Sequence, residues 1–239
     1  MRSIDRCAIA LVIALAVGAA APVAAPAGEP TEQLRTQLER VLKTVQDPEL
    51  KKAGRVAQRR AVRKVADEVF DYGDTARRAL SRHWAQRSAS ERQEFVALFA
   101  DLFEHAYISK VELFEGERVS YLGDSVEGGD ATVRTRFLTK QGSELNVDYR
   151  MQRGPSGRWV VYDVLIEGVS LIDNYRTQFN SVIQRSSYQE LVRKLKAIQS
   201  QLQKEAHQTD EKGSSASLAR RALPAAYATY ASVAPLLTA

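Results

Sequence analysis

The stretch from Trp159 to Phe179 constrains the fold most, because it predicts a strand, a tight turn and a helix in immediate succession. Apolar side chains occupy both sides of the strand 159–166, which is typical of a strand covered on both faces. One predicted side carries Trp159, Val161 and Leu165, and the other carries Val160, Tyr162, Val164 and Ile166. Glu167-Gly168-Val169 forms the turn. Ser170 is the predicted N-cap of the helix, with Asp173 in the capping-box position.

Three further strand candidates precede this segment, and Gly-rich turn signals separate them. The four predicted strands are Arg118–Val126, Ala131–Thr139, Glu144–Arg153 and Arg158–Ile166. Apolar and polar residues alternate along the second and third of these strands. The pattern predicts a curved four-stranded antiparallel sheet with one apolar face and one largely polar face, until the last strand.

Helical periodicity dominates the rest of the chain and is clearest over 91–107, where aromatic residues recur on one face. Two more helices are predicted after Ser170, the second running from Tyr188 to about Leu202. The predicted N-caps are Thr31, Asp47, Asp74, Ser88 or Ser90, and Ser170. The expected fold class is therefore α+β, with the sheet packed against a multi-helix subdomain.

The two ends of the chain differ from this central part. Residues 1–27 have the pattern of a secretory signal peptide, with a basic start, an apolar run and Ala25-Pro26-Ala27 as the cleavage site. The alternative is an uncleaved N-terminal anchor. Cys7, the one cysteine, lies in this segment, so the mature chain is expected to have neither a disulfide nor thiol chemistry. Residues 28–203 are predicted to form one domain. Residues 204–239, rich in Ala, Ser and Thr, are predicted to be a disordered tail.

The chain is mildly basic, with 34 Lys and Arg against 29 Asp and Glu. The excess is concentrated around 51–64 and 193–196. Such clusters can indicate a nucleic-acid partner, but the export signal argues against one. Two interpretations stay open: a solvated helix face, or a surface that meets anionic lipid headgroups or acidic partner proteins.

Residues with catalytic potential do not assemble into a recognisable set. The three histidines lack metal-ligand spacing such as H-x-x-x-H, and no G-x-S-x-G motif is present. Asp163 is the one candidate general base, because a carboxylate buried in a sheet has a raised pKa. The competing interpretation pairs Asp163 with an arginine such as Arg176, or with the backbone of the turn. Glu167 and Asn174 are expected to fix the strand–helix corner.

The segment Trp159–Phe179 resembles the MlaC (toluene-tolerance) family of periplasmic phospholipid carriers. It meets the approximate family pattern W-x-V-x-D-V-x-I-E-G-V-S-L-x-x-N-Y-R-x-Q-F, and Glu91-Arg92 with Phe95 matches a second family motif. The resemblance covers roughly Thr31 to Gln203. It implies a fold related to nuclear transport factor 2-like proteins, whose apolar cavity holds phospholipid acyl chains. It also implies no enzymatic activity, no cofactor and no metal.

The residue pattern alone cannot distinguish such a cavity from a dry core, but the resemblance makes two opposed groups of large apolar side chains the predicted lipid-binding residues. The group on the sheet is Val133, Phe137, Val147, Tyr149, Trp159 and Val161. The group on the helices is Phe95, Phe99, Phe103, Tyr107, Tyr175 and Phe179.

The resemblance further implies a monomeric carrier in the Gram-negative periplasm that maintains outer-membrane lipid asymmetry. It would be the substrate-binding component of an ABC-type system and would exchange phospholipid with two partners. These partners are an outer-membrane lipoprotein–porin complex and an inner-membrane ABC permease complex with a lipid-binding ring. The basic surface at Arg55–Lys64 is the predicted docking surface. Two alternatives remain: an isomerase-like enzyme with Asp163 as base, and a carrier for another apolar ligand such as a hopanoid.

Overall fold

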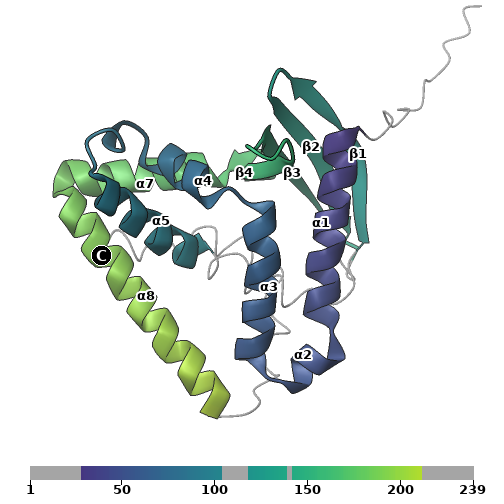
Figure 1. Cartoon of the computed structure of the whole chain (residues 1–239), viewed down its shortest axis with the longest axis horizontal. Helices are drawn as coiled ribbons and strands as arrows, with labels where there is room; N and C mark the ends of the chain where they lie inside the picture. Colours follow the sequence, from purple (N-terminus) through teal and green to yellow (C-terminus); the bar gives the residue numbers. More distant parts are fainter. Residues whose placement is uncertain (1–27, 104–117, 139–141, 212–239) are drawn as a thin grey trace, which may run out of the picture.

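The predicted antiparallel sheet is present and has the strand order β1-β2-β3-β4-β5. The computed structural model describes residues 28–103, 118–138 and 142–211 (Figure 1). The strands are β1 (Arg118–Glu127), β2 (Asp130–Leu138), β3 (Glu144–Arg153), β4 (Trp159–Ile166) and β5 (Val169–Ser170). The first four confirm the predicted strands. At each end that the structure describes, the observed and predicted bounds differ by at most one residue.

The short fifth strand was not predicted, and it arises from the conformation of the turn before it. Glu167 and Gly168 have positive φ angles of 49° and 78°. Two consecutive residues of this kind make the tight turn whose twist suits a β-hairpin. The chain therefore folds back at once, and Val169 pairs with Ile166.

The pairing of β3 with β4 corrects the predicted sides of β4. The register shifts between Arg150 and Met151, so that Met151 pairs with Val161 whereas Tyr149 pairs with Val164. Directly paired residues of two strands point to the same face of the sheet. A bulge places one extra residue in one strand, so residues beyond it point to the opposite face from the one that simple alternation predicts. Val164 consequently shares the apolar face with Val161, and the prediction that Leu165 does so was wrong.

The helices lie in two groups on either side of β4 (Figure 1). The group beside the sheet contains α1 (Glu29–Gln46), α2 (Pro48–Lys52) and α3 (Arg55–Val69). The other group contains α4 (Tyr72–Leu80), a 3₁₀ turn (Ser81–His83), α5 (Ala89–Phe103), α7 (Leu171–Arg185) and α8 (Tyr188–Glu211). Helix α8 thus continues past Gln203, where the domain was predicted to end. Residues 1–27 and 212–239, which hold the predicted signal and most of the predicted tail, lie outside the described residues.

Most of the predicted helix starts are confirmed. Ser170 Oγ accepts from the Asp173 amide at 3.0 Å, Asp47 caps α2, and the Glu91 amide donates to Ser88 Oγ. Two were wrong. Helix α1 begins at Glu29, and Thr31 is buried inside its first turn.

The cap of α1 comes instead from another part of the chain. Asp124 of β1 accepts from the amides of Gly28 and Thr31, both at 3.1 Å. For α4, the capping side chain is Asp71, which accepts from the Asp74 amide at 2.9 Å.

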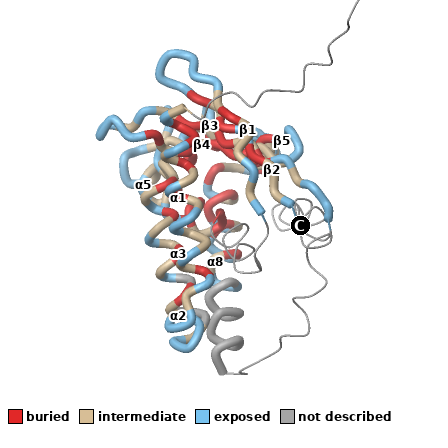
Figure 2. Tube along the Cα trace, turned by 90° about the vertical axis from the view of Figure 1, so that its right-hand side faces the viewer, coloured by how far each residue is buried: buried red, intermediate tan, exposed pale blue. Residues whose placement is uncertain are grey.

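The core runs through both groups of helices. Buried residues concentrate in the strands and in the adjoining parts of the helices (Figure 2). Helix α1 covers the apolar face of the sheet, where it contacts β1, β2 and β4. Helix α3 packs against α1, with Val45, Val62 and Ala66 forming a small separate cluster. Helix α5 packs between α4 and α8.

Candidate functional site

The sheet group of predicted site residues lies on the face that α1 covers. Val133, Trp159 and Val161 are at most 1 % exposed, and Val147 and Tyr149 are each 7 % exposed. Gln33 of α1 ties this face down, because it donates to the carbonyl of Trp159 and accepts from its amide. Phe137 is half-buried at the end of β2. This part of the predicted site is therefore packed beneath a fixed helix.

The helical group forms a continuous aromatic stack between α5 and α7. Phe99 lies at the centre of the stack, with its ring centroid 5.3 Å from Tyr175 and 5.9 Å from Phe179, both edge-on. Phe95 and Phe103 extend it along α5 at 6.1 and 6.2 Å from Phe99. Edge-to-face pairs at these distances contribute stabilising free energy in addition to that from the apolar area they bury. Tyr107 lies outside the described residues.

The two groups adjoin each other at Phe70. The backbone of Phe70 forms a bridge with Val161 of β4, and its ring lies 5.3 Å from Phe103 of α5. Tyr72 completes a triad, at 5.9 Å from Phe70 and 6.2 Å from Phe103. Phe70 and Tyr72 were not among the predicted lipid-binding residues. Two aromatics in a helix-breaking segment were the available signal.

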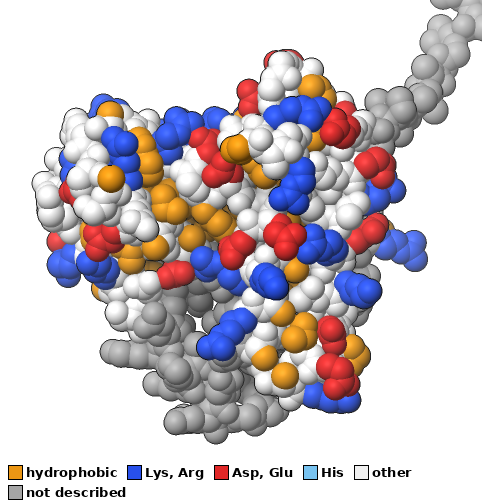
Figure 3. Space-filling model, viewed as in Figure 1, with side chains coloured by type: hydrophobic (Ala, Val, Ile, Leu, Met, Phe, Trp, Pro, Cys, Tyr) orange, Lys and Arg blue, Asp and Glu red, His pale blue; other side chains and the backbone are white. Residues whose placement is uncertain are grey.

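This triad of Phe70, Tyr72 and Phe103 lies near a recess on the molecular surface. In Figure 3, apolar side chains gather in the middle of the face, over the junction of α3, α4 and α5, with charged side chains of both signs around them. Phe70 and Tyr72 are half-buried, whereas Phe103 is 3 % exposed. The apolar core thus reaches the surface between the two groups of helices.

Asp163 occupies the strand–helix corner, on the opposite face of the sheet. It is 4 % exposed and accepts from Ser170 Oγ at 2.7 Å, from the Ile172 amide at 3.2 Å and from Arg150 at 3.2 Å. Burial raises the pKa of the Asp163 carboxyl, while the hydrogen bonds from Ser170 and Ile172 and the charge of Arg150 act in the opposite direction. These contacts favour the structural interpretation, since they occupy both carboxylate oxygens.

The predicted partners at this corner are confirmed in part. Arg176 was the wrong arginine, because it pairs with Asp173 at 2.9 Å and donates to the carbonyl of Arg78. Glu167 does fix the corner, where it accepts from the Asn146 amide at 2.6 Å. Asn174 does not, because its side chain accepts from Gln178 within α7.

A shallow groove lies beside the corner and has a different character from the aromatic recess. Its volume is about 430 Å³, and its lining includes Arg150, Leu165, Val169, Asn174 and Thr177. This mixed, open lining suits solvent or a polar group better than acyl chains.

Within the described residues, no group of three or more His, Cys, Asp or Glu side chains could hold a metal ion. His83 contacts Asn180, with Nε2 3.0 Å from Oδ1. None of the helices in that part of the chain is long and apolar enough to cross a membrane.

An open antiparallel sheet joined to a helical aromatic core is an α+β fold, and similarity to known proteins identifies the family. A model of the family described as MlaC protein matches residues 35–197. The chain therefore belongs to the MlaC family.

A curated relative and a solved structure agree with this assignment. The intermembrane phospholipid transport system binding protein MlaC of Haemophilus influenzae is 20 % identical over 128 residues, which cover 52 % of this chain and 60 % of the relative. A phospholipid-binding protein from Ralstonia solanacearum, solved in complex with a phospholipid, aligns with a TM-score of 0.66 and 27 % identity. That alignment covers 73 % of this chain and 99 % of the solved chain.

Proposed function

We propose that this protein is a phospholipid carrier that holds the acyl chains of its lipid in the apolar region described above. The observation that carries the proposal is the likeness to the Ralstonia protein, which contains a phospholipid and aligns over 99 % of its length. An enzymatic role has less support, since the candidate base Asp163 has its carboxylate occupied by structural partners.

The physical task of a carrier matches the composition of the site. Each methylene removed from water contributes about 0.8 kcal/mol, so two acyl chains need a long apolar surface and no catalytic group. The aromatic stack of Phe95, Phe99, Tyr175 and Phe179, with the triad of Phe70, Tyr72 and Phe103, supplies such a surface. The predicted sheet residues supply its continuation toward β4.

The wider role follows from the family. We infer that the mature protein works in the Gram-negative periplasm as a monomer, within an ABC-type system that maintains outer-membrane lipid asymmetry. Its partners would be an outer-membrane lipoprotein–porin complex and an inner-membrane ABC permease complex with a lipid-binding ring. The basic surface of α2 and α3 is available for such docking, because Lys51, Arg60 and Lys64 are exposed.

Native mass spectrometry of the protein purified from a Gram-negative periplasm, followed by lipid extraction, tests the central proposal. We expect about one diacyl phospholipid per protein. A co-purified hopanoid or other apolar molecule would favour the alternative ligand. A protein that is empty, and that takes no lipid from vesicles, would contradict the carrier function.

A pair of variants tests the site itself. Phe103→Glu places a carboxylate in the apolar region and should abolish loading, because an unpaired charge is expensive in an apolar site. Val126→Glu is the matched control, since Val126 is 51 % exposed on β1. Circular dichroism establishes that each variant folds, and Tyr72→Glu replaces Phe103→Glu if the latter does not. Normal loading in both Phe103→Glu and Tyr72→Glu would rule out this site.

A further inference from the structure

A chain of polar contacts crosses three helices at the recess. Arg63 of α3 lies 3.3 Å from Asp101 of α5, and Gln199 of α8 donates to the same carboxylate. Arg63 also pairs with Asp67, one turn further along α3, at 2.9 Å. We call Arg63, Asp101 and Gln199 the latch, because they join the helix beside the sheet to two helices of the other group.

The latch lies next to the aromatic triad. The guanidinium of Arg63 lies over the ring of Tyr72, 5.5 Å from its centroid. Asp101 is two residues before Phe103 on α5, and the ring of Phe103 contacts both Phe70 and Tyr72. Polar groups therefore border the place where the apolar core comes to the surface.

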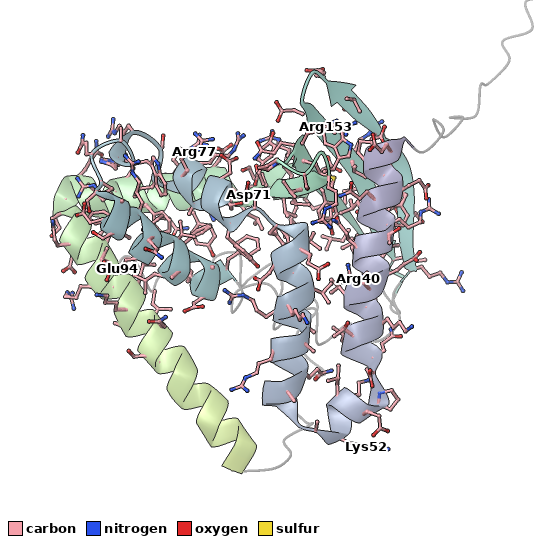
Figure 4. The ribbon with its side chains drawn as sticks, in the orientation of Figure 1. Arg40, Lys52, Asp71, Arg77, Glu94 and Arg153 are labelled. Atoms are coloured by element: carbon pink, nitrogen blue, oxygen red, sulfur yellow. The ribbon has the colours of Figure 1, made fainter. Side chains whose placement is uncertain are left out.

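The ion pair in the latch is well suited to open and close. The side chains of Arg63 and Asp101 are 27 % and 35 % exposed, so water can solvate both charges when they separate. Two other ion pairs between helices each act within one group. Glu94–Lys196 joins α5 to α8 at 2.6 Å, and Arg40–Glu68 joins α1 to α3 at 2.8 Å; Figure 4 labels Glu94 and Arg40.

We propose that the seam between α3 and the α5–α8 pair is the portal through which acyl chains reach the apolar region, and that the latch gates it. This inference rests on the proposed carrier function. Acyl chains can pass the triad only if Phe70 and Tyr72 separate from Phe103, and that separation pulls Arg63 away from Asp101. The latch then closes again over the bound lipid and limits the rates of uptake and release.

Transfer kinetics test the gate. The protein takes up a fluorescent phospholipid from vesicles of phosphatidylethanolamine and phosphatidylglycerol, and delivers it to unlabelled vesicles. Asp101→Asn and Arg63→Gln should each raise both initial rates about twofold to fivefold, as expected for loss of a partly exposed charge pair. Equilibrium loading should stay within about twofold of the wild type, because the apolar contacts are unchanged. The double variant should be no faster than either single one.

Glu94→Gln is the matched control, because it removes an ion pair of α5 that does not reach α3. It should transfer lipid at the wild-type rate. If Glu94→Gln is accelerated as much as Asp101→Asn, general loosening explains the result and the portal assignment is wrong. Wild-type rates in Asp101→Asn and Arg63→Gln would also overturn it, provided that the wild type loads lipid. A wild type that takes up no lipid would instead remove the carrier function itself. Melting curves identify any variant that does not fold, and the other variant then decides.

Discussion

The β4–α7 corner and the α3–α5 seam are each held by an aspartate that pairs with an arginine, but the two aspartates have different surroundings. Asp163 at the corner is 4 % exposed and accepts from a serine, a backbone amide and Arg150. Asp101 at the seam is 35 % exposed, and its partners are the long side chains of Arg63 and Gln199. The Asp163 carboxylate is enclosed by protein, with a serine hydroxyl and a backbone amide among its donors, whereas water can replace the partners of Asp101.

The comparison assigns different tasks to the two regions. A buried carboxylate with all its partners in place strongly penalises any separation of the elements that it joins. The corner therefore keeps β4 and α7 in a fixed relation. A partly exposed ion pair contributes little to stability and breaks at little cost. The seam can accordingly move while the corner does not.

The largest expected effect comes from removing the two aspartates in turn. Asp163→Ala should lower the free energy of unfolding by about 3 kcal/mol, because it leaves a buried amide and a hydroxyl without an acceptor and Arg150 without its counter-charge. Asp101→Ala should lower it by less than about 1 kcal/mol. Urea denaturation of both variants measures the difference. Equal losses would mean that the seam is as permanent as the corner.

Ser170 is a second residue that holds the corner, so its replacement tests the corner independently. Its hydroxyl accepts from the Asp173 amide at 3.0 Å and donates to Asp163 at 2.7 Å. Ser170→Ala should therefore lower the free energy of unfolding by about 1–2 kcal/mol, the upper range for loss of an N-cap. Ser187→Ala provides a control, because Ser187 Oγ caps the start of α8 at 3.1 Å without a buried carboxylate partner. The control should cost less, and an equal cost would indicate that the bond to Asp163 contributes nothing.

The pH dependence of stability should separate Asp163 from a second carboxylate, Asp74. Burial raises the pKa of Asp163 above 3.8, so its favourable contribution is complete below that pH and is lost as pH rises through the raised pKa. Burial also opposes ionisation of Asp74, but hydrogen bonds from Arg78 and Arg77 outweigh it and lower the pKa. Its contribution is present above 3.8 and is lost as pH falls through the lowered pKa.

Melting temperatures of Asp163→Asn and Asp74→Asn across this pH range measure these contributions against the wild type. The deficit of Asp163→Asn should shrink as pH rises above 3.8. The deficit of Asp74→Asn should shrink as pH falls below 3.8. Deficits that change with pH in the same direction would contradict this account of the corner.

The corner was largely predictable because its interactions are local in the sequence. The two-sided strand, the Gly168 turn and the Ser170 cap lie within a short stretch, and the structure confirms each of them. The errors there have a specific cause. Alternation along β4 could not reveal the register shift opposite Arg150, so Leu165 was placed on the apolar face. The arginine that pairs with Asp163 likewise comes from the neighbouring strand instead of the following helix.

The seam could not be predicted because it depends on contacts between distant segments. Arg63, Asp101 and Gln199 come from three helices, and nothing in their local sequence distinguishes them from solvated polar side chains. Asp124, which replaces Thr31 as the cap of α1, is missed for the same reason. The aromatic residues of α5 were recognisable from periodicity, but their junction with the sheet depends on Phe70, whose partner is Val161.

The smallest expected effect concerns Glu167, where a strained backbone and a useful side chain nearly cancel. A non-glycine residue at φ 49° costs about 1 kcal/mol relative to glycine. The Glu167 carboxylate offsets this cost by accepting from the Asn146 amide at 2.6 Å, a bond that contributes about 0.5–1.5 kcal/mol. Glu167→Gly removes both terms and should change the free energy of unfolding by less than about 0.5 kcal/mol.

Two companion variants separate the cost of the backbone strain from the contribution of the hydrogen bond. Glu167→Gln keeps the acceptor and the strain and should also be nearly neutral, whereas Gly168→Ala adds strain alone and should cost about 1 kcal/mol. An added Cβ at Gly168 would have no heavy atom within 4 Å apart from those of its two chain neighbours, so a clash with another part of the protein cannot explain that cost. A stabilising Glu167→Gly with a neutral Gly168→Ala would mean that the turn relaxes easily. The corner would then be held by Asp163 and Ser170 alone, and its rigidity relative to the seam would rest on the buried carboxylate.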